Sequence, residues 1–598
     1  MSETIKVTVV IDNEKSNTEF DGQKGQSVIV THDSSMTIMS TLLKNNLISG
    51  SFCGGRGDCG RCRIQFITGM TAPSALERSV MEPEELRKGY RLACLARPKD
   101  DCVVRLALLD TPKITVVSDV MGVPENNDYI SQRDFMTINQ KTYVMKSADA
   151  DEPESTGERT DIVEEDENEK AKTEEKETLI AVDLGTTTIA MQLMTMDTGR
   201  IADAYCEMNP QRSYGADVLS RIQASCGGSR EVLRKLAIEV LERGVERFRS
   251  HNTDIKCMCI AGNTTMEHLL MGYDVSFLGQ SPFTPVEIGL QEYQHPAWDF
   301  PVLLTPGISA FVGGDIVAGL YACNMLTLQP HRQSAEQEDY TGRLERDDQA
   351  KSTILIDLGT NGEMAITDGE RMIVTATAAG PAFEGGAGAD IVGSDMIACA
   401  AQLLRQGIMD ETGLLKEPYF AEGVSVFSTD IGKDEQGDGQ SKQQNKRNYI
   451  FRPGREGHSL YMRQEDIRDL QMAKAAVRAG VEILLKRLEE HRTDTARQNG
   501  VQCGSQQIDQ VYLAGGFGYY LDVEAAFEIG LLPEHMRGHV RAVGNTSLLG
   551  AYRIGRDLWQ NRIDRRTLEQ RLSLAESINL AEQKDFERLY IRCMDFVP

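Results

Sequence analysis

The sequence predicts a multidomain protein with an α+β N-terminal domain, a disordered acidic tether and an α/β C-terminal domain of two similar lobes. Its 598 residues correspond to roughly four domains at about 150 residues each. The composition changes sharply at residues 149–177, which separate the two ends of the chain. Beyond that segment one strand–turn–strand pattern occurs twice, at residues 179–199 and 353–369, and such a repeat favours two lobes of similar fold.

The charge balance and the hydropathy argue against several classes of protein. With 90 acidic and 64 basic residues the net charge is −26, which argues against a protein that binds nucleic acid or an anionic membrane. No stretch approaches the roughly 18 apolar residues of a spanning helix, and the N-terminus lacks the basic and apolar regions of a signal peptide. We therefore expect a cytoplasmic protein whose 13 cysteines serve metal or redox chemistry before disulfides.

Residues 1–108 have the pattern of a compact α+β domain. Alternating apolar residues from Ile5 to Ile11 indicate a first strand. Further predicted elements are strands at residues 27–30, Arg63–Thr68 and 102–108, and a helix at residues 36–46 that Ser34 or Ser35 would cap. We expect residues 109–148 to be a linker with some local structure.

Residues 149–177 contain fourteen acidic and four basic residues, which is more than a third of the excess negative charge. They carry almost no large apolar side chains and therefore cannot bury enough surface to offset the entropy of ordering. This composition predicts a disordered tether. It serves either as a solvated spacer or as a device that keeps the flanking domains apart until a partner arrives.

Residues 178–598 alternate apolar strands, glycine turns and amphipathic helices, and the clearest helical pattern lies at residues 473–490. Two polar stretches, residues 333–350 and 429–449, have the composition of surface insertions. Each copy of the repeat consists of an apolar strand, an Asp-Leu-Gly-Thr turn, a second strand and a tight hairpin. Together these features predict the two-lobed α/β domain.

Four cysteines, Cys53, Cys59, Cys62 and Cys94, have the spacing C-x5-C-x2-C-x31-C. Glycines around the first three let the backbone wrap closely around a cluster and turn N–H groups toward its sulfurs. Four thiolates ligate a [2Fe–2S] cluster. The alternatives are a zinc site, which usually takes its ligands in two close pairs, and unligated cysteines. With one extra residue in the first gap, the domain resembles a plant-type [2Fe–2S] ferredoxin, and the resemblance implies a β-grasp fold.

The remaining cysteines have no ligand-like grouping. We expect Cys102 in the core of its strand, and Cys257 and Cys259 on one buried face of another strand. The others are Cys206, Cys226, Cys323, Cys399, Cys503 and Cys593.

The repeated Asp-Leu-Gly-Thr turns have the chemistry of a phosphate site. Glycine lets the hairpin backbone approach phosphate oxygens, to which N–H groups and threonine hydroxyls donate, and the aspartates can hold Mg²⁺ through water. The pattern resembles the actin, Hsp70 and sugar-kinase superfamily of ATPases, which implies ATP and Mg²⁺; a fold that has lost its nucleotide is the alternative. On that resemblance the first phosphate motif is Asp183, Gly185, Thr186 and Thr187, the second is Asp357, Gly359, Thr360, Asn361 and Gly362, and the adenosine motif is Gly515, Gly516 and Phe517.

Three further segments, residues 262–266, 313–315 and 379–385, place small or polar residues where a strand should give way to a loop or a helix. The functional interpretations are a phosphate contact from the first, a carboxylate at Asp315 that positions water or Mg²⁺, and a ribose contact from Glu384. Ordinary turn chemistry is the alternative for each. Asp183, Asp357 and Asp315 are the candidate catalytic carboxylates.

An electron carrier joined to an ATPase makes sense if an electron must be moved energetically uphill. Apart from about residues 109–178, the chain resembles the reductive activators of corrinoid proteins in FVGGDIVAG, LIDLGTNGE, AAGPAFEGG, LAGGFG, GNTSLLGA and FVP. The resemblance implies an ATP-hydrolysing enzyme of anaerobic metabolism that reduces inactive Co(II) corrinoid to Co(I). Its partner would be the corrinoid protein of a methyltransferase system, and a small low-potential ferredoxin or flavodoxin is a candidate electron donor.

Three other functions stay open on the sequence alone. They are an activator of another low-potential enzyme such as a dehydratase, a small-molecule kinase with a fused redox-sensing ferredoxin domain, and a redox-responsive binding protein without catalysis. The corrinoid partner and the oligomeric state, including a homodimer, are not readable from the sequence.

Overall fold

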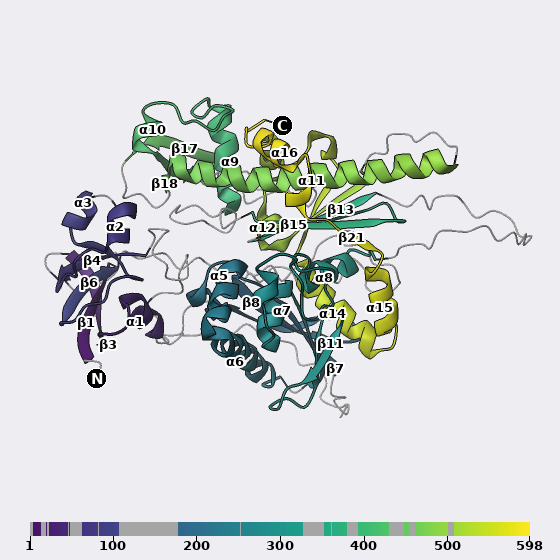
Figure 1. The fold of residues 1–598 in the computed structure, drawn as a ribbon, viewed down its shortest axis with the longest axis horizontal. Coiled ribbons are helices and arrows are strands. Elements are labelled where there is room, and N and C mark those ends of the chain that lie inside the picture. The colour runs from purple at the N-terminus through teal and green to yellow at the C-terminus, as the bar shows by residue number, and fades with distance from the viewer. Residues whose placement is uncertain are drawn as a thin grey trace, which may run out of the picture.

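The computed structural model describes residues 4–12, 19–20, 23–45, 47, 62–81, 83–106, 177–251, 253–326, 352–359, 361–379, 393–429, 448–454, 461–499 and 508–597. The expected linker at residues 109–148 and the expected tether at residues 149–177 lie outside the described residues, apart from Glu177. The described chain forms an N-terminal unit and a larger two-lobed unit, drawn in purple and in teal to yellow in Figure 1.

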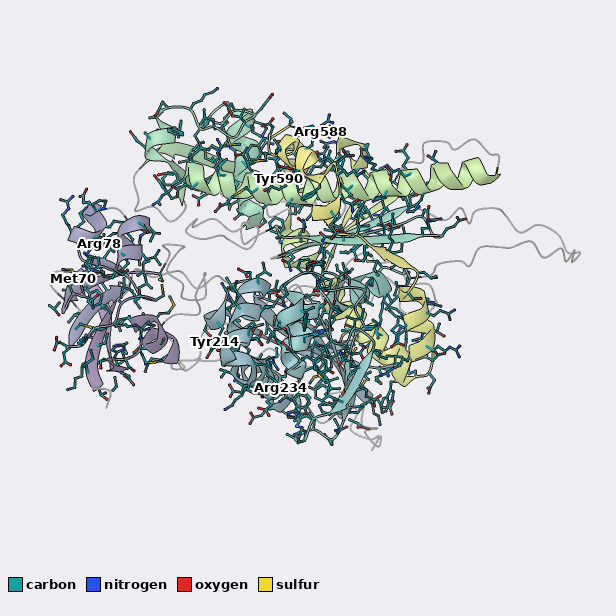
Figure 2. The ribbon with its side chains drawn as sticks, viewed as in Figure 1. Met70, Arg78, Tyr214, Arg234, Arg588 and Tyr590 are labelled. Carbon is teal, nitrogen blue, oxygen red and sulfur yellow. The ribbon has the colours of Figure 1, made fainter. Side chains whose placement is uncertain are left out.

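The N-terminal unit is a mixed sheet with helices beside it. Its strands have the order β2-β3-β1-β6-β4-β5, in which β1 runs parallel to β6 and antiparallel to β3. The elements are β1 Thr4–Asp12, β2 Glu19–Phe20, β3 Gln23–Asp33, α1 Ile38–Lys44, β4 Arg63–Thr68, α2 Ala75–Val80, α3 Pro83–Arg87, β5 Tyr90–Leu92 and β6 Cys102–Leu106. This mixed sheet confirms the predicted α+β fold, and Figure 2 shows Met70 and Arg78 on this unit.

Local sequence explains most of these elements. In β1 every second side chain is buried, as Ile5, Val7 and Val9 show, which confirms the predicted alternation. The predicted cap of the first helix is wrong. Thr37 caps α1, because its Oγ1 accepts a hydrogen bond of 3.3 Å from the Ser40 N–H, whereas Ser35 donates to Asp33 in the preceding turn.

The first lobe is built on a sheet with the order β11-β12-β10-β7-β8-β9. Strands β7, β8 and β9 form an antiparallel meander, and β10 and β12 add to β7 in parallel. The elements are β7 Glu177–Leu184, β8 Thr188–Thr195, β9 Ile201–Met208, η1 Pro210–Tyr214, α5 Val218–Ala224, η2 Ser225–Ser229, α6 Arg230–Phe248, β10 Asp254–Gly262, α7 Thr264–Met271, η3 Ser276–Leu278, β11 Gln291–Gln294, β12 Pro301–Leu304 and α8 Gly314–Ala322.

The second lobe repeats this plan. In its sheet, β20-β19-β13-β14-β15-β21, the meander β13-β14-β15 corresponds to β7-β8-β9, and β19 and β20 add to β13 in parallel. The elements are β13 Thr353–Leu358, β14 Gly362–Thr367, β15 Met372–Thr377, α9 Gly393–Arg405, α10 Tyr419–Glu422, β16 Val424–Thr429, β17 Asn448–Pro453, β18 Tyr461–Met462, α11 Gln464–Asn499, β19 Gln510–Ala514, α12 Gly515–Tyr520, α13 Val523–Glu528, η5 Glu534–Met536 and β20 Val540–Gly544. The internal repeat therefore does specify two lobes of similar topology.

The C-terminal elements are divided between the two lobes. They are α14 Thr546–Trp559, α15 Arg565–Leu572, β21 Ala575–Ser577, η6 Leu580–Glu582 and α16 Phe586–Arg592. Helix α14 leaves the second sheet and packs on α8, β7 and β10, and Figure 1 shows it in yellow among the teal elements of the first lobe. The two lobes thus share a central core around α8 and α14, to which Leu179 of β7 and Leu355 of β13 both contribute.

Two further expectations concern the lobes. The predicted helix at residues 473–490 lies within α11, a helix of 36 residues. Of the two expected insertions, residues 333–350 lie outside the described residues, and the second is corrected at its ends, where Thr429 belongs to β16 and Asn448 begins β17. Among the described helices, none has an apolar stretch long enough to cross a membrane.

Candidate functional site

Two of the four predicted cluster cysteines are described, and they lie side by side. Cys62 directly precedes β4 and Cys94 follows β5, and their Sγ atoms are 3.2 Å apart. This separation is too long for a disulfide, which is about 2.05 Å. The hydrogen bond with the Cys94 thiol lowers the pKa of Cys62 to about 7, so a thiolate forms readily. Cys53 and Cys59 lie outside the described residues.

The strands hold this cysteine pair in place through the backbone. The Ala93 N–H donates to the Cys62 carbonyl at 2.7 Å. The Leu92 N–H donates to Oε1 of the buried Glu77 at 2.8 Å, and Glu77 in turn belongs to the capping box of α2. Facing thiols on a rigid frame fit two ligands of an iron–sulfur cluster, so the described half of the predicted site has the required chemistry.

Other cysteines have the packing role that the sequence predicted for them. Cys102 is 3% exposed in β6, and burial raises the pKa of its thiol to about 11. Cys257 and Cys259 are both fully buried and face the central core of the two lobes. These three thiols are therefore unsuited to bind a metal, since a metal needs the thiolate.

In the first lobe, the turn between β7 and β8, which carries the predicted first phosphate motif, is held in one shape by its neighbours. A Cβ on Gly185 would lie 2.6 Å from the Thr188 carbonyl oxygen, so only glycine fits there. Asn263 donates to the Thr186 hydroxyl at 3.1 Å, Asn209 donates to the Gly185 carbonyl at 2.9 Å, and the buried Arg221 donates to the Thr186 carbonyl. Because these hydrogen bonds hold the Gly185 and Thr186 carbonyls, the shape of the loop does not depend on a ligand. Thr187 is the next residue of the same turn.

Asp183, at the end of β7, connects the two lobes. Asn545 donates through Nδ2 to its Oδ2 at 2.8 Å, and the Ser547 hydroxyl donates to its Oδ1 at 3.1 Å. Asn545 follows β20 of the second lobe and caps α14 by accepting a hydrogen bond from the Leu548 N–H. The first phosphate motif is thus joined directly to the second lobe.

Asp315 lies where the first lobe brings two helix starts together. It is in the first turn of α8, and its Oδ1 accepts a hydrogen bond of 2.8 Å from the Ile316 N–H. The preceding Gly313 touches the start of α7 so closely that a Cβ there would lie 2.4 Å from the Thr264 nitrogen. The structure therefore brings two of the three singled-out segments, 262–266 and 313–315, into contact.

The second phosphate turn and the adenosine motif also meet. Asp357 ends β13 beside Ala514 of β19, and a Cβ on Gly515 would lie 2.6 Å from the Asp357 Oδ1. Gly515 has φ of +86°, which favours glycine further. Gly359 donates to the Asn361 carbonyl at 2.9 Å, and Gly362 begins β14. Thr360 and Glu384 lie outside the described residues.

The rest of the adenosine motif begins α12. Gly516 is exposed, and a Cβ there would meet nothing within 4 Å, whereas Phe517 packs on the core of the second lobe. An open backbone next to an anchored aromatic ring offers a surface for a flat base. The adenosine role of this motif stays a prediction.

Burial raises the pKa of four carboxylates in this site, and for three of them the charge of a neighbouring carboxylate adds to the effect. Burial, followed by the charges of Asp315 and Asp183, raises the pKa of Asp357 to about 8. Burial and Asp183 raise the pKa of Asp315 to about 7, and burial with the charges of Asp315 and Asp357 raises that of Glu363 in β14. Burial also raises the pKa of Asp183, although Asn545 and Ser547 oppose this. A cation bound beside these carboxyl groups would lower their pKa values and favour their ionised forms.

The residues present therefore fit Mg²⁺ and a phosphate chain. No described lysine or arginine forms an ion pair with Asp183, Asp315, Asp357 or Glu363, so their charge is left for a ligand to balance. Within the described residues no three such side chains come close enough to bind a metal directly. Mg²⁺ would instead be held through water and phosphate oxygens, as it commonly is.

Several residues of this site were not predicted from the sequence. Asn545 and Ser547 contact Asp183 across more than 360 residues of chain, and no local pattern reveals such a contact. Their segment, GNTSLLGA, was the only available signal. Glu363 was not singled out although it ends the LIDLGTNGE segment, because one acidic residue in a strand does not reveal that it is buried among other carboxylates. Arg221 was not singled out because a lone arginine on a helix has no specific meaning.

Family models match three stretches of the chain. Residues 22–99 match a 2Fe-2S iron-sulfur cluster binding domain. Residues 179–327 match the RACo middle region, and residues 351–390 and 388–598 match the C-terminal domain of RACo, described as the ASKHA domain.

Two curated relatives and one solved structure agree with these matches. The corrinoid activation enzyme RamQ of Eubacterium limosum is 26% identical over 415 residues, which cover 62% of this chain and 63% of that protein, a little under two thirds of its length. A [Co(II) methylated amine-specific corrinoid protein] reductase of Methanosarcina barkeri is 22% identical over 456 residues, covering 69% and 76%. The structure entitled "Reductive activator for corrinoid,iron-sulfur protein" has 20% identity and a TM-score of 0.52, and the match covers 99% and 98% of the two chains.

The fold and the two sites define an iron–sulfur protein with a [2Fe–2S] domain and an ATPase domain of the actin, Hsp70 and sugar-kinase type, which takes ATP and Mg²⁺. Both RACo models match in order along the C-terminal two thirds of the chain, and residues 100–178 separate them from the iron–sulfur domain. The chain belongs to the family that these RACo models describe.

Proposed function

We propose that this protein uses ATP to drive the one-electron reduction of an inactive Co(II) corrinoid protein to the Co(I) form. One observation carries the proposal: a close thiol pair in a ferredoxin-type sheet, Cys62 and Cys94, and a two-lobed carboxylate site occur in one chain. The named activities of the two relatives, a corrinoid activation enzyme and a corrinoid protein reductase, point the same way.

The energy required is within reach of binding. Plant-type [2Fe–2S] clusters have potentials near about −400 mV. An acceptor about 100 mV lower makes the electron transfer unfavourable by about 2.3 kcal/mol, since about 59 mV is tenfold for one electron and tenfold is about 1.4 kcal/mol. A closed, ATP-bound form that binds the Co(I) state of the corrinoid protein more tightly than its Co(II) state can supply this difference.

The chain's own residues would couple nucleotide to lobe closure. A phosphate chain between the turns at Gly185 and Gly359 contacts both lobes, and Asn545 and Ser547 already connect Asp183 to the second lobe. Asp183, Asp315 and Asp357 would hold Mg²⁺, and its positive charge would favour their ionised forms. Because these carboxylates come from both lobes, this attraction would draw the lobes together. After hydrolysis this attraction weakens, and the lobes separate.

The iron–sulfur domain would hold its cluster through Cys53, Cys59, Cys62 and Cys94. A bound [2Fe–2S] cluster supplies one-electron transfer. The hydrogen bonds made by Ala93 and Glu77 keep the Cys62 and Cys94 thiols facing one another. Burial keeps Cys102 from becoming a ligand.

The partners follow from this role. The corrinoid protein of a methyltransferase system accepts the electron, and a small low-potential ferredoxin or flavodoxin in the cytoplasm supplies it. Assembly as a homodimer is compatible with this scheme, and light scattering of the purified chain would measure it.

The proposal is tested with purified full-length protein, a low-potential reductant, Mg²⁺ and ATP, mixed with candidate Co(II) corrinoid proteins. We expect the Co(I) absorption band to appear, and to be lost in Cys94→Ser and in Asp357→Asn. Matched controls are Cys226→Ser, which removes an exposed thiol, and Asp299→Asn, which removes an exposed carboxylate. If Co(I) forms equally well without ATP, or if a small molecule is phosphorylated instead, the proposal is wrong.

A further inference from the structure

Arg221 is a fully buried arginine beside the turn between β7 and β8. It lies in α5, which begins with a capping box between Asp217 and Ser220. Burial of a guanidinium group is costly unless its N–H groups are hydrogen-bonded. The hydrogen-bond partners of this side chain therefore indicate its role.

The guanidinium group of Arg221 joins α5 to the β7–β8 turn, to η1 and to α7. Its Nη2 donates to the Thr186 carbonyl, its Nε to the Gly215 carbonyl at 3.0 Å and its Nη1 to Gln211 Oε1 at 3.4 Å. The same Nη1 lies 3.1 Å from the sulfur of Met266 in α7. A lysine ammonium group could not reach acceptors in these different directions, whereas the planar guanidinium group, with five N–H donors, can.

Thr186 is held at both its carbonyl and its side chain. Arg221 bonds to the carbonyl, and Asn263 donates through Nδ2 to the hydroxyl at 3.1 Å. Asn263 also caps α7, because its Oδ1 accepts a hydrogen bond of 3.0 Å from the Met266 N–H. The orientation of Thr186 is therefore set by α5 and α7 together.

The held carbonyls determine where the N–H groups of the turn point. The Thr186 carbonyl and the Thr187 N–H belong to one planar trans peptide group and point in opposite directions. Because Arg221 holds the Thr186 carbonyl on the buried side, the Thr187 N–H is turned to the other side. Asn209 donates to the Gly185 carbonyl at 2.9 Å and in the same way directs the Thr186 N–H. Successive N–H groups turned away from the interior form the concave anion site of phosphate-binding turns.

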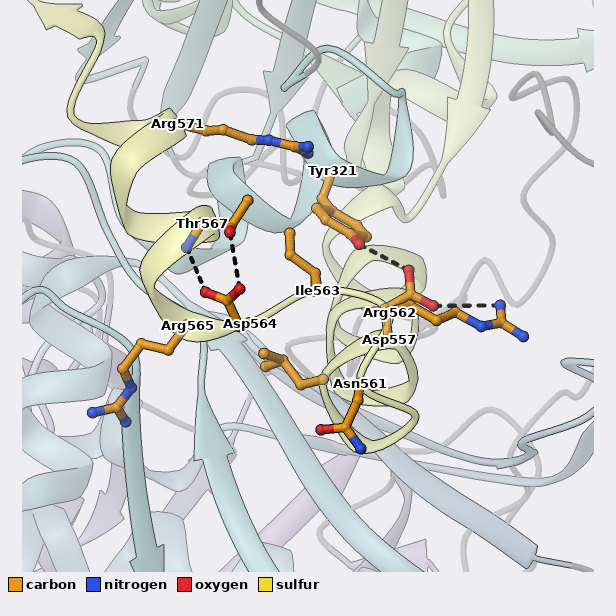
Figure 3. A pocket seen from close by; sticks show the side chains of 10 residues that line it. Tyr321, Asp557, Asn561, Arg562, Ile563, Asp564, Arg565, Thr567 and Arg571 are labelled. Carbon is orange, nitrogen blue, oxygen red and sulfur yellow. Dashed lines mark hydrogen bonds and ion pairs between the residues drawn. The ribbon is translucent and has the colours of Figure 1, made fainter.

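Other arginines of the described chain do not converge in this way. A cavity of about 470 Å³ at the end of α14 and the start of α15 is lined by Arg562, Arg565 and Arg571 (Figure 3). Arg562 lies 3.6 Å from the Asp557 carboxylate, and the side chains of Arg565 and Arg571 point apart. These guanidinium groups therefore do not fix one segment of backbone, as Arg221 does.

We propose that Arg221 is a positioning residue for the nucleotide phosphates, which acts through the peptide group between Thr186 and Thr187 and does not touch the nucleotide. The inference rests on the proposed function, in which this turn binds ATP. A charged donor makes a strong hydrogen bond to the carbonyl and polarises the peptide group, so its N–H becomes a better donor to phosphate. Loss of the guanidinium group would free this peptide group to rotate, whereas the adenosine motif at Gly515, in the second lobe, would be unaffected.

Calorimetric titration of the full chain with the ATP analogue AMP-PNP and Mg²⁺, and separately with adenosine, tests the role of Arg221. Arg221→Gln should weaken AMP-PNP binding by roughly tenfold, the effect of one lost charge-assisted hydrogen bond, and leave adenosine binding unchanged. Arg221→Lys keeps the charge but not the planar fork and should also weaken AMP-PNP binding.

The matched control is Arg234→Gln in the same lobe. Arg234 also donates to a backbone carbonyl, that of Leu270 at 3.1 Å, but it belongs to α6 and has no contact with the turn (Figure 2). This variant should bind both ligands as the wild type does.

A selective loss of AMP-PNP affinity in the Arg221 variants supports the proposal. Unchanged AMP-PNP affinity overturns it, and so does an equal loss of AMP-PNP and adenosine affinity, which would show that Arg221 only supports the fold of the lobe. If Arg221→Gln does not fold, Arg221→Lys decides between these outcomes. A wild type that binds neither ligand contradicts the proposed function and the role of Arg221 together, whereas a wild type that binds both and variants that lose neither contradict the role of Arg221 alone.

Discussion

At the scale of residues, the account depends on one carboxylate shared between two lobes. Asp183 belongs to the first lobe, but both of its hydrogen-bond donors, Asn545 and Ser547, follow β20 of the second. A partly buried carboxylate that loses these donors pays the desolvation cost without compensation. We therefore expect this contact to orient the predicted phosphate motif and to depend on the position of the lobes.

Replacing Asn545 by alanine should lower ATP turnover by roughly tenfold, because a hydrogen bond to a charged group is worth about 1.5–3 kcal/mol. The matched control is Asn579→Ala, which removes a helix cap of the same kind far from Asp183, at the start of η6. Steady-state ATP hydrolysis measures both variants. Equal rates in the two variants would show that capping, and not the Asp183 contact, is what Asn545 contributes.

Binding of Mg²⁺ and nucleotide at pH 7 should release protons. The pKa of Asp357 is raised to about 8 and that of Asp315 to about 7, so both are partly protonated when no cation is present. A bound cation favours the ionised forms and lowers both pKa values, which expels protons. Calorimetry in buffers of different ionisation enthalpy measures the number released.

The release should shrink as pH rises above about 8, where the unliganded carboxylates are already ionised. Asp357→Asn should release fewer protons than the wild type at pH 7. Proton uptake, or the same release from Asp357→Asn, would contradict the assignment of these carboxylates to the cation.

At the scale of elements, the crossing of α8 and α14 carries the central core. Gly550 is required there because a Cβ would meet the Ala318 carbonyl oxygen at 1.9 Å. Gly550→Ala should therefore destabilise the two-lobed unit by about 1–3 kcal/mol, the usual effect of overpacking. Thermal unfolding measures this against Gly227→Ala, where a Cβ would meet nothing within 4 Å. An unchanged melting temperature in Gly550→Ala would show that α8 and α14 can move apart without a loss of stability.

Elements with a strong local signal were predictable, and long-range contacts were not. The strand–turn–strand repeat gave both sheets, since alternation, glycine turns and aspartates are local features. The predicted cap of α1 was wrong by two residues because Ser34, Ser35 and Thr37 are all suitable cap residues. Only the structure shows that Ser35 donates to Asp33 instead. The path of α14 between the lobes depends on packing that no single stretch encodes.

At the scale of the whole molecule, one chain joins an iron–sulfur domain to an ATPase of two similar lobes. Their order along the chain was readable from the cysteine spacing and the repeat, because each motif is compact. The arrangement of the two units was not predictable. The predicted tether at residues 149–177 is acidic and almost without large apolar side chains, and such a composition specifies no packing contact.

The coupling of nucleotide to electron transfer is the central claim, and a measurement at fixed ambient potential tests it most directly. The fraction of Co(I) in a corrinoid partner is recorded with the full chain and reductant held at one potential, first without nucleotide and then with Mg²⁺ and ATP. We predict that Co(I) rises upon addition of ATP and that ATP hydrolysis rises in the presence of the Co(II) partner. A fraction of Co(I) that ATP leaves unchanged would contradict the account.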